Sequence, residues 1–428
     1  MRANELVALL RGGALKEHAS IYSDLDAASE RIIAAVEGFA ERFGAERDIY
    51  VFSVPGRSEV VGNHTDHNNG RVLAAAIDRD VIAVAAKNTD MTVRFNSEGY
   101  APDTVNVLDT YTTDNFEKYT SSALIAGVIN GFENRGYAVG GFDCYSTSEV
   151  LKGSGISSSA AYEVMIGNIL NHLYNGGRIE NRELAHIAQY AENRYFGKPC
   201  GLMDQMACAV GGFVFIDFAV PSAPTVEPIG FSLRDAGYSL CIVNTGGNHA
   251  DLNEDYASVP REMRAVASAL GREVLSGITE DELIAKIPEL RVTLGDRAIL
   301  RALHFIRENK RVDAAVAALE RGSVSDFFAV VRASGRSSFE YLQNVYTNVN
   351  IKEQGLSLAL ALTDGFLDGQ GITADSALRV HGGGFAGTVQ VFLPSERLSQ
   401  YAEYIEGVFG KGAALALNVR PVGACRLF

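Results

Sequence analysis

The sequence has little of what marks several large classes of protein. It contains no tryptophan, 10 prolines and only 5 cysteines in 428 residues. The cysteines are scattered and form no C-x-x-C pair, so neither a zinc knuckle nor a disulfide framework is supported, and a reducing compartment fits. No apolar run approaches the roughly 20 residues of a membrane-spanning helix, and the apolar stretch near the N-terminus is too brief for a secretion signal. We expect a cytoplasmic protein with no membrane partner.

Positive charge is also scarce. Lysine and arginine total 38 against 52 aspartates and glutamates, which gives a formal net charge of −14 at pH 7. A nucleic-acid partner would require a basic face, so we expect none. A small anionic ligand is compatible with this charge, because a local nest of backbone N–H groups can hold phosphate inside an acidic protein.

The residues that are present describe an ordinary globular chain, 47% apolar and 21% charged, with room for two to three domains. Strands and helices do not alternate regularly, which favours an α+β fold over a doubly wound sheet. An irregular, proline-containing stretch over 219–236 marks the best domain boundary. We expect a helical N-terminal extension over 1–44, an N-terminal domain over 45–222 and a C-terminal domain over 223–428.

Local patterns give the expected elements. Short runs rich in valine, isoleucine and aromatic residues predict strands over 50–54, 71–77, 81–86, 91–95, 142–148 and 211–218. Helical spacing of apolar residues predicts helices within 1–46 and over 121–136, 160–174 and 181–195, the last capped by Gly197, and a helix-rich region over 260–370.

The first motif with chemical meaning is the loop LKGSGISSSAA (151–161), which opens directly onto an amphipathic helix. Two glycines let backbone amides converge, and three serines follow at the helix N-terminus, where the helix dipole and unsatisfied N–H groups favour phosphate. The alternative is a serine N-cap after a tight turn. The loop is neither a Walker A loop nor a dinucleotide fingerprint, but three consecutive serines favour a phosphate site, and their hydroxyls can also bind Mg²⁺.

The second motif is the polar loop PGRSEVVGNHTDHNNG (55–70), which lies between two expected strands. Its asparagines, histidines and aspartate both donate and accept hydrogen bonds, which suits recognition of sugar hydroxyls. An ordinary asparagine-rich turn and, given two histidines and an aspartate, a metal site are the alternatives.

Two further segments are informative. AENRYFGKPCGLMDQ (191–205) carries Glu192 and Asp204. A buried Asp204 would need a cationic partner, for which Arg57 is the candidate, whereas Glu192 could simply be a solvated helix carboxylate. HGGGFAG (381–387) taken alone indicates only a tight turn or a bulge before a strand.

Taken together, in this order and spacing, these motifs resemble those of the GHMP small-molecule kinases, most closely the galactokinases. The family's sugar signature G-R-x-N-x-x-G-E-H-x-D-Y-x-x-G is matched by GRSEVVGNHTDHNNG from Gly56 to Gly70. Its phosphate loop P-x-G-x-G-L-S-S-S-A, its segment A-E-x-x-x-x-G-x-P-C-G-x-M-D-Q and its turn T-G-G-G-F-G-G are similar to residues 151–160, 191–205 and 381–387. A fifth segment, NTGGNHADLNEDY (244–256), is similar to the stretch that ends in a sugar-contacting tyrosine.

The resemblance implies an α+β, two-domain GHMP kinase fold, with a ribosomal S5-like N-terminal domain, a ferredoxin-like C-terminal domain and an active site in the cleft between them. It also implies an ATP- and Mg²⁺-dependent sugar 1-kinase that converts galactose to galactose 1-phosphate and releases ADP. A monomer or weak oligomer is the expectation that follows from such relatives.

The resemblance also implies a role for each matching residue. Asp204 would act as the catalytic base or electrostatic stabiliser at the anomeric hydroxyl, and Arg57 would orient it and depress its pKa. Ser159 and Glu192 would hold Mg²⁺. The sugar would be bound by Asn63, His64, Asp66, Gly201 and Tyr256. The ATP phosphates would be held by Gly153, Ser154, Gly155, Ile156, Ser157, Ser158 and Ser159. A glycine turn would close over the site with Gly382, Gly383 and Gly384.

Four positions depart from the family pattern: Asn63 replaces a glutamate, His67 a tyrosine, Leu151 a proline and His381 a threonine. The glutamate contacts the sugar around its C6 hydroxyl in galactokinases, so Asn63 makes galacturonate an alternative substrate, and N-acetylgalactosamine or arabinose are further options. A non-catalytic galactokinase-like sugar sensor is the alternative from another class. It is disfavoured here because the serines of the phosphate loop and the predicted catalytic residues are intact.

Overall fold

The chain folds into two compact units. The computed structural model describes residues 1–22, 24–150, 155–198, 200–247 and 252–428. Unit 1 comprises residues 1–57, 76–212 and 420–428, and unit 2 comprises residues 58–75 and 213–419. The division falls at 212–213, ahead of the irregular stretch 219–236. Most of the sugar signature lies in unit 2, as do residues 71–75, which pair with β6 (Phe213–Asp217).

Unit 1 is built on a sheet in the order β12-β1-β2-β5-β3-β4. Its strands are β1 (Tyr50–Val61), β2 (Arg71–Lys87), β3 (Thr92–Ser97), β4 (Asp103–Asn106), β5 (Phe142–Ser148) and β12 (Cys425–Arg426), with β1 and β2 continuing into unit 2. β3 and β5 are parallel, whereas β2–β5 and β3–β4 are antiparallel.

Strand β2 differs from the sequence-based expectation of two strands over 71–77 and 81–86. Asp80 looks like part of a polar turn, yet it lies within a continuous, buried strand. Its carboxylate accepts hydrogen bonds from Tyr22 at 2.9 Å and from Arg420 at 3.1 Å. A charge that is paired inside the core does not interrupt a strand.

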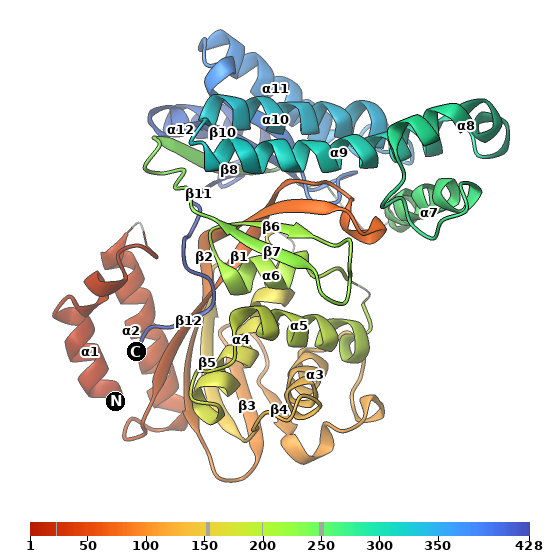
Figure 1. Cartoon of the computed structure of the whole chain (residues 1–428). Helices are drawn as coiled ribbons and strands as arrows, with labels where there is room; N and C mark the ends of the chain where they lie inside the picture. The colour runs from red at the N-terminus through yellow and green to blue at the C-terminus, as the bar shows by residue number, and fades with distance from the viewer. Residues whose placement is uncertain (23, 151–154, 199, 248–251) are drawn as a thin grey trace. The chain divides into compact units, whose positions relative to one another are not determined.

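The helices of unit 1 lie on both sides of this sheet (Figure 1). They are α1 (Ala3–Arg11), α2 (Leu25–Phe43), α3 (Ser121–Glu133), α4 (Ser158–Tyr174), α5 (Asn181–Ala191) and α6 (Met203–Val210), joined by a 3₁₀ turn η1 (Ala14–His18) and a π turn η5 (Glu192–Phe196). Ile32, Val36 and Phe39 of α2 are fully buried in one cluster with Ile82 and Val84 of β2. The predicted N-terminal helices therefore form part of the core of unit 1.

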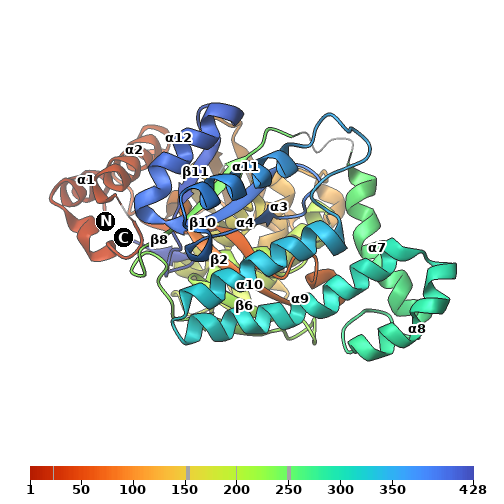
Figure 2. The same ribbon diagram turned by 90° about the horizontal axis from the view of Figure 1, so that it is seen from above.

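Unit 2 contains an antiparallel sheet in the order β11-β8-β10-β9, formed by β8 (Tyr238–Asn244), β9 (Ala377–His381), β10 (Thr388–Pro394) and β11 (Ala414–Leu417). β7 (Thr225–Ile229) pairs with β6. The helices are α7 (Asn253–Ala269), α8 (Glu280–Thr293), α9 (Asp296–Glu320), α10 (Val324–Ser337), α11 (Gly355–Gly369) and α12 (Leu398–Phe409). Figure 2 shows α9 and α10 running side by side. Among the described residues, no helix is long and apolar enough to cross a membrane.

Candidate active site

Asp204 and Arg57, predicted to act together, are brought together in unit 1. Asp204 lies in the first turn of α6, and Arg57 lies in β1. The guanidinium binds the carboxylate with two hydrogen bonds, Nε to Oδ1 at 2.7 Å and Nη2 to Oδ2 at 2.9 Å. Burial alone would raise the pKa of Asp204, but the charge and hydrogen bonds of Arg57 hold it below its usual value. Asp204 is thus an oriented, ionised carboxylate, and its side chain is about one third exposed.

The phosphate loop meets this pair at Ser157. The Ser157 hydroxyl donates to Asp204 Oδ2 at 2.5 Å, and Ser157 takes a left-handed conformation with φ of 63° at the start of α4. Its side chain therefore does not cap α4. Because no side-chain cap occupies them, the first backbone amides of α4 can bind an anion. Gly56 allows the loop to approach β1, because a Cβ there would lie 2.7 Å from the Ile156 carbonyl oxygen. The predicted residues Gly153 and Ser154 lie outside the described residues.

The predicted metal-binding pair also forms. The Ser159 hydroxyl lies 3.2 Å from Glu192 Oε1, at the point where α5 changes into the π turn. Glu192 is buried, and Lys198 Nζ lies 3.3 Å from the same carboxylate oxygen. A hydroxyl and a carboxylate are hard oxygen donors of the kind that Mg²⁺ prefers, so these residues fit the ion. Among the described residues, no group of three or more histidines, cysteines, aspartates or glutamates could hold a metal ion.

Two buried polar side chains, Gln205 and Glu163, support Glu192. Gln205 Nε2 donates to Glu192 Oε2 at 2.7 Å and to Glu163 Oε2 at 3.2 Å. Burial and the charge of Glu192 raise the pKa of Glu163 well above its usual value, which favours its protonated form. Gln205 therefore orients Glu192 by binding its second carboxylate oxygen. Sequence reasoning missed Glu163, although it lies one helical turn after Ser159.

In unit 2, Asn63 has no capacity left for a ligand. Its side chain is fully buried, and Nδ2 donates to Glu59 Oε1 at 2.9 Å and to the Gly382 carbonyl oxygen at 2.8 Å. Its Oδ1 accepts from Asn344 Nδ2 at 2.8 Å and from the Ser338 hydroxyl at 3.3 Å. The side chain thus supports the surrounding loops, whereas the sequence had suggested a direct contact with the sugar.

The other sugar-signature residues of unit 2 meet the glycine turn. His64 Nε2 lies 2.9 Å from the Gly383 carbonyl oxygen, and the Tyr256 hydroxyl donates to the Gly384 carbonyl oxygen at 2.7 Å. Gly384 has a φ of 82°, and a Cβ there would lie 2.0 Å from the Asn344 carbonyl oxygen, so only glycine fits.

The two remaining predicted sugar-binding residues lie at the start of a short helix or shortly before one. Asp66 is half-buried and begins the 3₁₀ turn Asp66–Asn68 in unit 2. Gly201 is exposed and lies shortly before α6 in unit 1.

Helix α9 holds the backbone of the sugar signature. His304 Nε2 lies 2.9 Å from the Asn63 carbonyl oxygen, and Glu308 Oε1 accepts from the Gly62 N–H at 3.0 Å. Burial lowers the pKa of His304 to about 4. Burial alone would raise the pKa of Glu308, but the charges of Arg311 and His304 lower it to about 2. Sequence reasoning missed both residues, because nothing in the local sequence of a long helix indicates a contact with residues 62–63.

Glu59 is a further departure from the family pattern that sequence reasoning missed. The pattern has asparagine at this position and glutamate at position 63, whereas this chain has Glu59 and Asn63. Glu59 is buried, and its Oε1 accepts from Asn63 and from Arg379 Nη2 at 3.1 Å. The amide and the carboxylate have exchanged places within one hydrogen-bonded pair.

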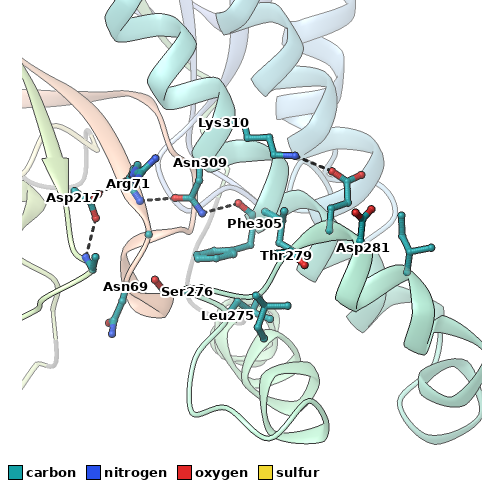
Figure 3. A pocket seen from close by; sticks show the side chains of 17 residues that line it. Asn69, Arg71, Asp217, Leu275, Ser276, Thr279, Asp281, Phe305, Asn309 and Lys310 are labelled. Carbon is teal, nitrogen blue, oxygen red and sulfur yellow. Dashed lines mark hydrogen bonds and ion pairs between the residues drawn. The ribbon is translucent and has the colours of Figure 1, made fainter.

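A cavity of about 520 Å³ lies beside the end of the sugar signature in unit 2 (Figure 3). Asn69, Gly70 and Arg71 contribute to its lining, together with residues from α8 and α9. None of the predicted site residues lines it. We therefore place the candidate active site at the residue clusters described above and not in this cavity.

Comparisons with known proteins show which families the chain resembles. The chain matches the family model for the N-terminal domain of GHMP kinases over residues 123–212 and that for the galactokinase galactose-binding signature over residues 37–87. A galactokinase of Streptomyces coelicolor is 30% identical over 391 residues, which cover 90% of this chain and 94% of that protein.

Solved structures show the same fold. The structure of Lactococcus lactis galactokinase complexed with galactose matches with a TM-score of 0.75 at 24% identity, covering 91% of this chain and 98% of that one. Methanococcus jannaschii mevalonate kinase matches with a TM-score of 0.60 at 13% identity, covering 87% and 98%.

The fold is thus the α+β fold of the GHMP kinases, which confirms the fold class expected from the motifs. Within that class, the chain belongs to the galactokinase family. It is accordingly a phosphotransferase with ATP as its phosphoryl donor.

Proposed function

We propose that this enzyme phosphorylates the anomeric hydroxyl of galactose with Mg²⁺-ATP, giving galactose 1-phosphate and ADP. The observation that carries the proposal is the Arg57–Asp204–Ser157 cluster beside the N-terminus of α4. It combines an oriented carboxylate with an anion-binding helix end. The proposal is supported by the likeness to the galactokinase of Streptomyces coelicolor.

Asp204 acts on the attacking hydroxyl. In phosphoryl transfer the protein mainly positions the groups and stabilises developing charge. Because Arg57 lowers its pKa, Asp204 is ionised but a weak base. It therefore orients the hydroxyl in the ground state and takes its proton late, when bond formation has made that proton more acidic.

The phosphates of ATP lie at the start of α4. The amides of Ser158 and Ser159 and the loop around Gly155 face the anion, as helix N-termini do in other phosphate sites. Ser159 and Glu192 would hold Mg²⁺, which would neutralise phosphate charge when bound. Lys198 adds a positive charge beside Glu192.

The sugar is read by the polar residues of the signature. In unit 2 we assign this role to His64, Asp66 and Tyr256, and in unit 1 to the backbone around Gly201. Asn63 instead fixes the loop that carries them, because all of its hydrogen bonds are made within the protein. The glycine turn over 382–384 closes over the sugar.

A coupled assay of ADP release tests the proposal. With Mg²⁺-ATP we expect turnover with galactose and much less with galacturonate, N-acetylgalactosamine, arabinose or glucose. Because Asn63 Nδ2 already makes two hydrogen bonds within the protein, it has no N–H left to donate to a C6 carboxylate. Turnover confined to another sugar of the panel would overturn the substrate assignment. Binding of galactose and ATP without turnover of any sugar would favour the sensor.

A further inference from the structure

A strongly basic groove lies in unit 2 on the helix pair α9–α10. It encloses about 440 Å³, and its charged lining residues are Arg307, Arg311, Arg332, Arg336 and Glu340. We call it the arginine groove. Four arginines against one glutamate are unusual in a chain with a net charge of −14. The arginines form one i, i+4 pair on each helix, and like charges at that spacing repel.

Part of this charge is uncompensated within the protein. Arg307 is paired with Glu280 at 2.6 Å. In the part of the chain that the structure describes, Arg336 makes no ion pair or hydrogen bond through its side chain. Burial and the charge of Arg336 together lower the pKa of Arg332, so the two guanidinium groups repel each other. An anion between them would relieve this repulsion.

The cavity in Figure 3 provides a contrast within the same unit. There the cations are already paired, Arg71 with Asp217 at 2.8 Å and Lys310 with Glu280 at 3.2 Å. Among the described residues, Asp281 is the charged side chain of this lining that has no ion pair, so the uncompensated charge there is negative and does not favour an anion. The arginine groove therefore carries the stronger indication of a ligand.

We propose that the arginine groove binds a small phosphate-bearing anion of the sugar-phosphate class. Planar guanidinium groups match the oxygens of phosphate with paired hydrogen bonds. The volume lies in the range of sites for small molecules. The acidic character of the remaining chain works against a long polyanion, whose distant charges would be repelled.

Arg311 connects the groove to the sugar signature. Its Nε donates to Glu308 at 2.6 Å and its Nη2 to the Ser337 hydroxyl at 2.7 Å, and Glu308 in turn accepts from the Gly62 N–H. An anion that draws Arg311 toward the groove leaves the fully buried Glu308 with less compensation and loosens its hold on Gly62. The bound anion therefore raises the KM for galactose, a consequence that rests on the proposed function.

Calorimetric titration of the full-length protein with galactose 1-phosphate, without ATP, tests the site directly. Arg336→Glu is expected to weaken one binding event at least tenfold. Arg321→Glu is the matched control, because it changes the net charge equally, its side chain is 61% exposed, and it does not line the groove. This control is expected to bind within twofold of the original protein. Inorganic phosphate, used as a second probe, is expected to bind more weakly and to respond to the same variant.

Unchanged binding in Arg336→Glu, or equal losses in both variants, would overturn the site, because the signal would then come from the active site or from net charge. In steady-state assays, galactose 1-phosphate is expected to raise the KM for galactose more in the Arg321→Glu variant than in the Arg336→Glu variant. An equal rise in both would overturn the link through Arg311. Binding in the groove without any kinase activity would support the site while removing the proposed function.

Discussion

At the scale of single residues, the Asp204 carboxylate is firmly oriented but weakly basic. Arg57 binds both oxygens of Asp204, and Ser157 adds a third hydrogen bond. Each of these contacts favours the ionised carboxylate, so Asp204 is held in one place but accepts a proton reluctantly. In the mechanism proposed above, Asp204 therefore contributes mainly through its position and charge, as proteins mainly do in phosphoryl transfer.

The exchanged pair Glu59–Asn63 yields a residue-scale prediction. Asn63→Glu places a second buried carboxylate beside Glu59, so that Arg379, which pairs with Glu59, would face two carboxylates. We therefore expect a clear loss of stability and at least a tenfold rise in the KM for galactose. Adding Glu59→Asn restores one amide and one carboxylate and should recover at least half of both losses. Thermal unfolding and steady-state kinetics measure the two effects. Strictly additive losses in the double variant would contradict the coupling between these residues.

His304 gives a prediction of pH dependence. Its pKa is about 4 in the folded protein, against 6.5 for an ordinary histidine, because burial disfavours the charged form. Between these values the unfolded chain binds a proton that the folded protein does not, so stability falls as the pH decreases from 6.5 to 4. The full shift corresponds to about 3 kcal/mol. Glu308 contributes little between pH 6.5 and 4.5, because its own loss of stability comes as the pH falls from 4.5 toward 2.

Urea unfolding at pH 6.5 and pH 4.5 measures this slope. His304→Gln keeps a donor for the Asn63 carbonyl oxygen but does not titrate, so it should reduce the loss of stability between the two pH values. His67, whose pKa burial also lowers, accounts for part of what remains. An identical slope in His304→Gln and the original protein would show that His304 is not the cause.

At the scale of elements, α2 packs on the sheet of unit 1 and contributes to its core. Phe39 is fully buried against the sheet, whereas Glu37 on the same helix is largely exposed. We expect Phe39→Ala to reduce the free energy of unfolding by about 3–5 kcal/mol, because it removes a large core side chain. Glu37→Ala is the matched control and should change stability by under about 0.5 kcal/mol. A cost below 1 kcal/mol for Phe39→Ala would mean that α2 is only loosely attached.

The same scale shows where sequence reasoning succeeded. The helices and strands with strong periodicity formed where expected, and Gly197 ends its helix with a φ of 85°. The pairing of Arg57 with Asp204, 147 positions apart, was expected because a buried aspartate needs a cationic partner, and the family motifs implied it as well. The continuity of β2 did not follow, because the partners that neutralise Asp80 come from α2 and from the C-terminal segment.

At the scale of the whole molecule, the parts of the site that could not be predicted are those assembled from several distant segments. The Asn63 side chain has no hydrogen bond left for a sugar because Glu59, Asn344 and the glycine turn already bind it. A motif states which residue types occur together, but the number of hydrogen bonds left for a ligand depends on the packing of every neighbouring segment. The motifs therefore predicted the reaction better than the role of each sugar-signature residue.

The most direct test of the central claim is the identity of the product and its dependence on Asp204. We would incubate the enzyme with Mg²⁺-ATP and galactose and locate the new phosphate by NMR. We expect phosphorus coupled to the anomeric proton, and a rate about 10²–10⁴-fold lower for Asp204→Asn, the range typical of a positioned acid–base group. Phosphate on any other hydroxyl, or an undiminished rate in the variant, would contradict this claim.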